Sequence, residues 1–308
     1  ATQTEHHRPY NGVVPEIASR THTEWILPVY ARALREAGLT IGDIDGVAVT
    51  GRPGLLGALL VGLAFGKALA YGRGIPFVAV DHVRAHLFAP HIENDITYPY
   101  LGLLVSGGHT LIAVVKDFDD ISVLGTTIDD ACGEAFDKVA KHYGFGYPGG
   151  AAVDRLARNG DDGAFSFPDP SLHKGEHRFD VSYSGLKTAV INQLDKFRNP
   201  GFEATPENIA ASFQKAAVDI LLRRLFRAVE ETGIRRLGAG GGVAANSRLR
   251  ASLRERTDLS VVFPSPVLCT DNGAMIAALG HELIRRGVTS PWTENASARV
   301  PAFKRSYP

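Results

Sequence analysis

The sequence predicts an α/β protein of two domains. Helical and β-branched segments alternate between residues 21 and 82, the order expected of βαβ units. A glycine-containing hairpin follows at 99–115, and 234–250 is a strand that runs into glycines and then a helix. The 308 residues suit two domains of about 150 residues each. We place the boundary near residue 98, in the polar stretch ENDITYP.

Composition narrows the class of protein. With 44% hydrophobic and 21% charged residues the chain has the make-up of a globular enzyme. Its formal net charge of zero excludes a global affinity for nucleic acid or membranes, so such a partner needs a local patch. We expect Cys132 and Cys269 to be free thiols in a reducing compartment. No apolar run is expected to reach the ~18 residues of a membrane span, and the N-terminus has no secretory pattern, which predicts a cytosolic or organelle-matrix protein.

The first half of the chain is predicted element by element. Helical periodicity over 21–40 ends at Gly38, and IDGVAVTG then gives a short strand. Residues 54–74 are apolar almost all round, which predicts a buried helix with glycines at close-packing positions; Lys67 argues against a membrane span. The run IPFVAVDH at 75–82 supplies the next strand.

The second half begins with a different pattern. In PYLGLLVSGGHTLIAVV, two apolar runs flank Ser106, Gly107 and Gly108, which predicts a hairpin and a second sheet. Residues 205–233 form a long amphipathic helix. The strand and glycines of IRRLGAGGGVAAN come next and lead into another helix.

Two histidines in DHVRAH could bind a metal ion. His82 and His86 are four positions apart, so on a helix their imidazoles lie one above the other and can converge on one ion. That spacing also occurs by chance, and a third ligand is required. Asp271, at the start of an apolar helix, could be that ligand or could simply be an N-cap.

Two glycine-rich segments could approach phosphate groups. VSGGHT at 105–110 places backbone N–H groups and a hydroxyl at a strand end without side-chain bulk, although a plain hairpin turn would look the same. GAGGGVAANSRLR at 238–250 combines a strand, glycines and a helix start. Its spacing matches neither the dinucleotide fingerprint nor the P-loop, which disfavours a dehydrogenase.

An acidic group occurs in TTIDDACGEAFDKVAKHYGFGYPGG. Asp129, Asp130, Glu134 and Asp137 fall on one predicted helix, where a solvated acidic face is the ordinary interpretation. However, Asp130, Glu134 and Asp137 share one stripe. Three crowded carboxylates are unfavourable unless a cation or sugar hydroxyls lie opposite them.

The segments together resemble the universal tRNA threonylcarbamoyladenosine transferase family, the TsaD type of bacteria. The resemblance runs through NGVVPEIASRTH, PGLLGALLVG, LVSGGHT, DDACGEAFDKVAK, YPGG, SYSGLKTAV, GGGVAAN and CTDNGAMIA. It implies two ribonuclease-H-like lobes of the superfold shared by acetate kinase, heat-shock chaperones and actin (ASKHA). The lobes would be 1–98, on which 283–308 could pack back, and 99–282.

The resemblance also implies site residues. His82, His86 and Asp271 would bind one divalent metal ion, with iron favoured and zinc or manganese as alternatives. The phosphate and carbamoyl part of an adenylate would contact the segment made of Leu104, Val105, Ser106, Gly107 and Gly108. Its ribose and adenine would be held by Asp137, Gly150, Asp154 and Asn246. SGLK adds Ser184 and Lys187, which either line the cleft or are a helix N-cap and a surface lysine.

The implied reaction is attack by N6 of adenosine 37 in tRNA on the carbonyl of L-threonylcarbamoyl-AMP, with release of AMP. The implied partners are tRNA and paralogous and ATPase proteins of the same machinery, in a homo- or heterodimer. The arginines concentrated between residues 223 and 256 predict the surface that binds tRNA.

Departures from the family pattern leave alternative functions open. Arg84 and Ala85 replace the usual Glu-Gly between the histidines, and Arg52 replaces a glycine. Family members begin earlier, with an N-terminal strand hairpin, so we expect the chain printed here to bind AMP but transfer poorly. A kinase or ATPase of the same superfold and a degenerate scaffold paralogue are the alternatives. A metalloprotease is disfavoured, because Val83 stands where H-E-x-x-H requires a glutamate.

Overall fold

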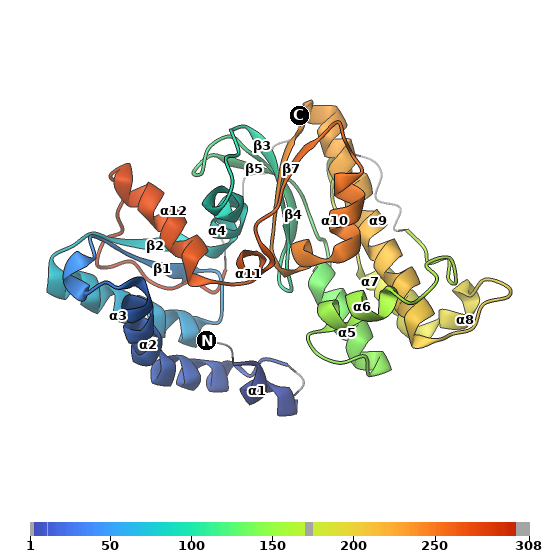
Figure 1. Cartoon of the computed structure of the whole chain (residues 1–308), viewed down its shortest axis with the longest axis horizontal. Helices are drawn as coiled ribbons and strands as arrows, with labels where there is room; N and C mark the ends of the chain where they lie inside the picture. Colours follow the sequence, from blue (N-terminus) through green and yellow to red (C-terminus); the bar gives the residue numbers. More distant parts are fainter. Residues whose placement is uncertain (1–2, 11, 170–174, 300–308) are drawn as a thin grey trace. The chain divides into compact units, whose positions relative to one another are not determined.

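The computed structural model describes residues 3–10, 12–169 and 175–299, and these form two compact units (Figure 1). The first unit contains the described residues up to Ala85 together with those from Gly273 onward. The second contains His86–Asn272. The divisions therefore differ from the boundaries at 98 and 282 that the sequence suggested.

The first unit is built on a two-stranded parallel sheet. Strands β1 (Val47–Arg52) and β2 (Phe77–Asp81) pair in parallel, with helix α3 (Leu56–Arg73) between them, so the expected βαβ unit is confirmed. The unit's other elements are α1 (Thr4–His7), η1 (Arg8–Tyr10), α2 (Pro15–Ala37), η2 (Ile41–Asp43) and α12 (Gly273–Arg285). Helix α12 packs on both strands, and Gly280 permits the close approach, since a Cβ there would lie 2.2 Å from that of Ala48. This packing is why 273–282 belongs to the first unit.

Helix α3 differs from the expectation of a buried helix. It packs against α2 and β1, and only Leu63, Gly66 and Ala70 are buried. Those two elements cover one face of α3, so apolar residues on the rest of its surface remain exposed. By length and composition α3 could cross a membrane, contrary to the expectation that no run reaches that length. Lys67, within it, donates a hydrogen bond of 2.8 Å to the carbonyl of Trp292.

The second unit contains a mixed five-stranded sheet of order β5-β4-β3-β6-β7. Strands β3 and β4 form the expected antiparallel hairpin, and β3, β6 and β7 are parallel. The strands are β3 (Tyr100–Val105), β4 (Thr110–Val115), β5 (Ile121–Thr126), β6 (Arg236–Gly240) and β7 (Ser260–Val262). Every residue of β3 and β4 is buried, as expected for strands covered on both faces.

Helices cover this sheet and complete the core. The long helix expected over 205–233 is α9 (Pro206–Thr232), which begins at a Thr205 cap and ends at Gly233. The other elements are α4 (His82–Phe88), which crosses the division between the units, η3 (Ala89–Ile92), α5 (Cys132–Tyr143), α6 (Gly149–Ala157), η4 (Gly175–His177), α7 (Ser184–Asn192), α8 (Leu194–Phe197), η5 (Gly242–Ala245), α10 (Ser247–Arg254) and α11 (Pro266–Cys269). Cys132 and Cys269 are free and buried, as expected.

Contacts after α4 explain why 86–98 joins the second unit. The hydroxyl of Tyr100, in β3, donates a 2.8 Å hydrogen bond to the carbonyl of Leu87. The rings of Tyr98 and Tyr100 stack with centroids 5.6 Å apart. Residues 86–98 are therefore attached to the five-stranded sheet. The polar composition of 93–98 did not indicate this attachment.

The two glycine-rich loops start at the same edge of the sheet. Leu104 of β3 pairs with Gly240 of β6, and parallel strands bring their carboxyl ends together. Gly241 has φ of 91°, and a Cβ there would lie 2.3 Å from the carbonyl oxygen of Val105. Only glycine allows the backbones to approach so closely at this edge.

Candidate functional site

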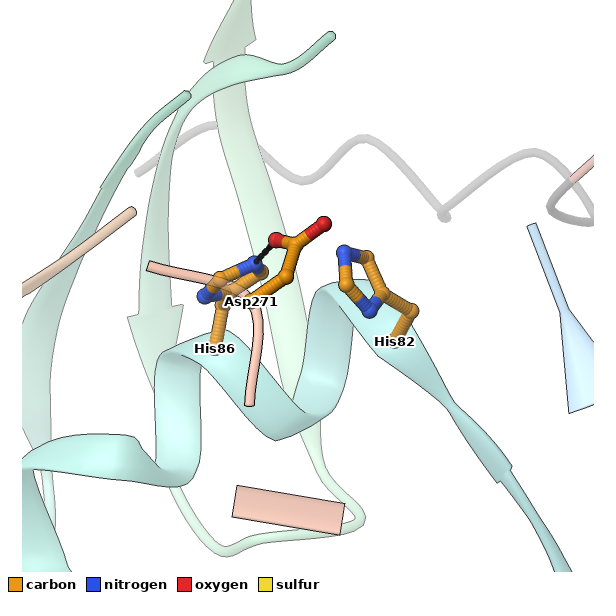
Figure 2. Close-up of side chains that lie close together, drawn as sticks. All are labelled: His82, His86 and Asp271. Carbon is orange, nitrogen blue, oxygen red and sulfur yellow. Dashed lines mark hydrogen bonds and ion pairs between the residues drawn. The ribbon is translucent and has the colours of Figure 1, made fainter. Parts of the chain in front are cut away.

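The two histidines and the late aspartate lie together (Figure 2). His82 and His86 are one turn apart on α4, and Nε2 of His86 is 3.1 Å from Oδ1 of Asp271. One ligand atom from each of the three residues lies within 4.8 Å of the other two. The side chain of His86 is 1% exposed and that of Asp271 is 78% exposed.

This arrangement fits one divalent cation. Imidazole nitrogens and carboxylate oxygens bind such ions at about 2.0–2.2 Å, which places neighbouring ligand atoms roughly 3 Å apart. The separation of 3.1 Å between His86 and Asp271 has this size. Helix α12 begins at Gly273, and the side chain of Asp271 faces His86, which favours the ligand interpretation over the N-cap. Two imidazoles and one carboxylate suit iron, zinc or manganese equally well.

Asp81 fixes the start of the helix that carries the histidines. Its Oδ1 accepts hydrogen bonds from the backbone N–H groups of Val83 (2.9 Å) and Arg84 (3.2 Å), as an N-cap does. Its Oδ2 is 3.3 Å from Nε of Arg52, the residue that departs from the family pattern. This role was not predicted from the sequence, although an aspartate directly before a helix is the usual signal of an N-cap.

The segment predicted to contact phosphate forms a hydrogen-bonded turn whose two glycines face open space. The side chains of Leu104 and Val105 are in the core. Ser106 closes the turn, because its Oγ accepts from the backbone N–H of His109 at 3.0 Å. Gly107 and Gly108 have open space where a Cβ would be. Only Ser106–Gly108 is therefore accessible to a ligand.

Helix α5 connects this turn to the next part of the site. The N–H of Gly133 donates to the carbonyl of Ser106 at 3.2 Å, and a Cβ on Gly133 would lie 2.9 Å from Cα of Gly107. One turn later on α5, Asp137 Oδ1 accepts from the N–H of Gly149 at 2.8 Å. Burial raises the pKa of the Asp137 carboxyl above its ordinary value, against the hydrogen bonds from the α6 backbone.

Helix α6 carries two of the predicted site residues and contacts the start of α10. Gly150 and Asp154 are four positions apart, and Gly150 has open space at its Cβ position. Asp154 Oδ1 accepts from both the N–H (3.0 Å) and the hydroxyl (2.6 Å) of Ser247, directly after Asn246. Hydrogen bonds thus connect Asp137 on α5, Gly150 and Asp154 on α6, and Asn246 at the start of α10, and α5 contacts the Ser106 turn.

The side chain of Asn246 makes hydrogen bonds within the protein. Its Oδ1 caps α10 by accepting from the N–H of Leu249 at 3.1 Å, and its Nδ2 donates to Gln214 at 3.0 Å. The residue is 7% exposed. The amide that we expected to face adenine is therefore largely used within the protein.

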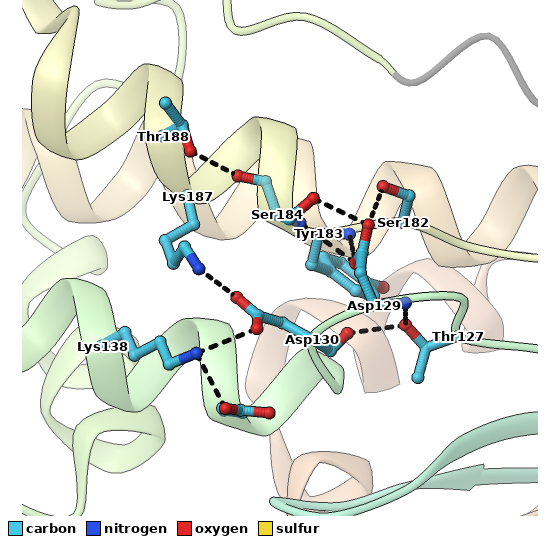
Figure 3. A network of polar contacts seen from close by, with 10 residues as sticks. Thr127, Asp129, Asp130, Lys138, Ser182, Tyr183, Ser184, Lys187 and Thr188 are labelled. Atoms are coloured by element: carbon cyan, nitrogen blue, oxygen red, sulfur yellow. Dashed lines mark hydrogen bonds and ion pairs between the residues drawn. The ribbon is translucent and has the colours of Figure 1, made fainter.

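Lysines pair with two of the three carboxylates of the acidic stripe, Asp130 and Glu134 (Figure 3). Helix α5 begins at Cys132, so the prediction that Asp129 and Asp130 lie on it was wrong. Asp130 binds Nζ of Lys138 (2.9 Å) and Lys187 (2.6 Å), and Lys138 also binds Glu134 at 2.8 Å. Although burial acts to raise the pKa of Asp130, these ammonium groups hold it below its ordinary value. No further cation is needed to explain the crowding.

Asp129 holds the start of α7 in the same network (Figure 3). Its Oδ1 accepts from the N–H groups of Tyr183 (2.8 Å) and Ser184 (3.1 Å), and its Oδ2 accepts from the Ser184 hydroxyl at 2.7 Å. Ser184 is therefore not the N-cap residue, and Lys187 is tied to Asp130. Both side chains connect α7 to the loop before α5.

The arginines of 223–256, where the sequence predicts a surface for tRNA, are in part paired with carboxylates. Several face carboxylates: the pairs are Arg223–Asp169, Arg235–Asp258, Arg248–Asp162 and Arg256–Asp258. Arg224 is 2% exposed. Asp169, Asp162 and Asp258 therefore pair with part of the positive charge of this region.

Comparisons with known proteins identify the family of the chain. Residues 1–278 match the TsaD family model, tRNA N6-adenosine threonylcarbamoyltransferase. Relatives with that name come from Treponema denticola (63% identity, covering 99% of this chain and 90% of the relative) and Borreliella burgdorferi strain B31 (50%, 99% and 88%). Full-length HypF in its phosphate- and nucleotide-bound form has a TM-score of 0.63 at 17% identity, over 87% of this chain and 51% of that chain, a likeness of fold alone.

The family model covers most of the chain, and relatives with half or more of their residues identical span nearly all of it. The chain belongs to the TsaD family of tRNA N6-adenosine threonylcarbamoyltransferases.

Proposed function

We propose that the chain transfers the threonylcarbamoyl group from L-threonylcarbamoyl-AMP to N6 of adenosine 37 in tRNA. The observation that carries this proposal is the family match over residues 1–278. The N6 amine attacks the carbamoyl carbonyl carbon and forms a C–N bond. The bond from that carbon to the phosphate oxygen breaks, AMP departs with the electron pair, and the amine loses a proton.

The residues of the second unit suit an adenylate. The open backbone of Ser106–Gly108 lies at the carboxyl end of β3, where N–H groups can meet phosphate oxygens. Asp137 and Asp154 offer carboxylate oxygens to ribose hydroxyls, and Gly150 leaves space for a flat base. Asn246 would contribute mainly by fixing the start of α10 beside Asp154.

His82, His86 and Asp271 would hold the divalent cation. Their donor set suits iron, zinc and manganese alike, and the family resemblance favours iron. When bound, such an ion supplies polarisation of carbamoyl or phosphate oxygens. Asp81 contributes by capping α4 and so orienting both imidazoles.

The superfold, the partners and the location are proposed from the family. The two units would be the two ribonuclease-H-like lobes of the ASKHA superfold, which the likeness to HypF supports. Their limits would follow the divisions after residues 85 and 272. The macromolecular partners would be tRNA and paralogous and ATPase proteins, in a homo- or heterodimer, and the location would be the cytoplasm.

Release of AMP from threonylcarbamoyl-AMP tests the reaction. With the partner proteins present, we expect release to require tRNA and to match the modified adenosine formed. Gly150→Val should slow AMP release more than about tenfold, because the valine fills the space for the base. This corresponds to an increase of about 1.4 kcal/mol or more in the activation free energy.

Gly185→Val is the matched control, because Gly185 also has open space and lies on α7. Turnover of ATP to ADP without tRNA, and no release of AMP, would instead favour the kinase alternative. A protein that folds and binds tRNA but shows neither reaction would favour the scaffold alternative.

A further inference from the structure

The segment that carries Asp271 has little regular structure of its own. It follows the buried Pro264, contains the single-turn helix α11, and reaches Asp271 with a side chain that is 78% exposed. An exposed carboxylate on such a segment would sample many positions. Asp271 nevertheless lies 3.1 Å from the buried His86, so something must hold the segment in place.

Arg250, on α10, binds both ends of α11. Its Nη2 donates to the carbonyl of Pro264 at 2.9 Å and lies 3.2 Å from Sγ of Cys269, two residues before Asp271. Its Nε donates to the carbonyl of Ala244 at 2.8 Å. The guanidinium also lies over the ring of Phe263, 4.7 Å from its centroid. The planar fork of one arginine thus joins the segment to the body of the second unit.

A second tether connects the segment with the element that carries His86. Oε2 of Glu93 accepts a 2.6 Å hydrogen bond from the backbone N–H of Ser265. Glu93 follows η3, which continues directly from α4. The segment is therefore fixed to α10 by Arg250 and to the end of the histidine-bearing element by Glu93.

We propose that Arg250 is a positioning residue for the metal centre, which holds the α11 segment so that the Asp271 carboxylate reaches the ion beside His86. The proposal rests on the metal site of the proposed function. A lysine cannot reproduce the role, because one ammonium group cannot make the same forked contacts or lie flat on Phe263. Residues that orient a metal ligand typically change metal affinity by about 10- to 100-fold when lost.

Competition of the full chain with a chromophoric chelator for Zn²⁺ or Co²⁺ measures this affinity. We expect Arg250→Ala to weaken metal binding by about 10- to 100-fold and Arg250→Lys to restore little of it. Arg254→Ala is the matched control, because Arg254 is exposed and one turn further along α10. It should leave the affinity unchanged. Equal affinities for Arg250→Ala and Arg254→Ala would overturn the proposal.

A double-mutant cycle separates positioning from general destabilisation. If Arg250 acts through Asp271, adding Arg250→Ala to Asp271→Ala should change the residual affinity by less than about twofold. An equal loss in both backgrounds would contradict the proposal. If Arg250→Ala does not fold, Glu93→Ala replaces it as the test of how the α11 segment is held. We expect Glu93→Ala to weaken metal binding as well, and an unchanged metal affinity would contradict the proposal. Absence of metal binding by the unchanged protein would refute the metal centre itself, whereas AMP release would still test the transfer reaction.

Discussion

Replacing both His82 and His86 with alanine is expected to abolish metal binding. The double substitution removes two of the three ligand atoms that lie within 4.8 Å of one another and leaves a single exposed carboxylate. Loss of a residue that merely orients a ligand already costs about 10- to 100-fold in affinity, so loss of two ligands should exceed about 1000-fold. Elemental analysis of protein purified without chelators measures the result.

Controls make the result specific to these histidines. His142→Ala removes an exposed histidine on α5 and should leave the metal content unchanged. Thermal unfolding shows whether the cavity left by the buried His86 has disturbed the fold. A folded double variant with full metal content would refute the assignment of the ligands.

Gly241→Ala is expected to destabilise the second unit strongly. The added Cβ would lie 2.3 Å from the carbonyl oxygen of Val105, and φ at this position is 91°. Val105 ends a strand between two others, so its backbone cannot readily move away. A backbone clash combined with an unfavourable φ predicts a loss of about 3 kcal/mol or more in the free energy of unfolding.

Urea unfolding measures this loss, and AMP binding should weaken with it because the edge that carries both glycine loops is displaced. Gly242→Ala is the neighbouring control, since a Cβ there meets nothing within 4 Å. Equal stabilities for the two variants would contradict the close approach of β3 and the β6 loop.

Local signals made much of the fold predictable. Gly38 and Gly233 end helices α2 and α9, where their φ values of 68° and 71° are left-handed. The exposure of α3 could not be predicted, because it depends on how many elements pack around the helix. The division after residue 85 was missed for a similar reason: the contacts that decide it, such as Tyr100 with Leu87, belong to tertiary packing.

The site was predictable where spacing along one element determines it. The interval between His82 and His86 places both on one face of α4. Asp271 is 185 positions from His86, and the choice between a ligand and an N-cap for it came from the family resemblance. Partners distant in sequence explain the errors. Asp130 meets Lys187 57 positions away, and this pairing accounts for carboxylates that had suggested a ligand.

Transfer to two tRNAs that differ only at position 37 tests the central claim most directly. With threonylcarbamoyl-AMP and the partner proteins present, the account predicts threonylcarbamoyladenosine in the tRNA with adenosine 37. It predicts none in the tRNA with guanosine 37, which has no N6 amine. Mass spectrometry of the digested nucleosides measures both. Equal modification of the two tRNAs, or none in either, would contradict the account.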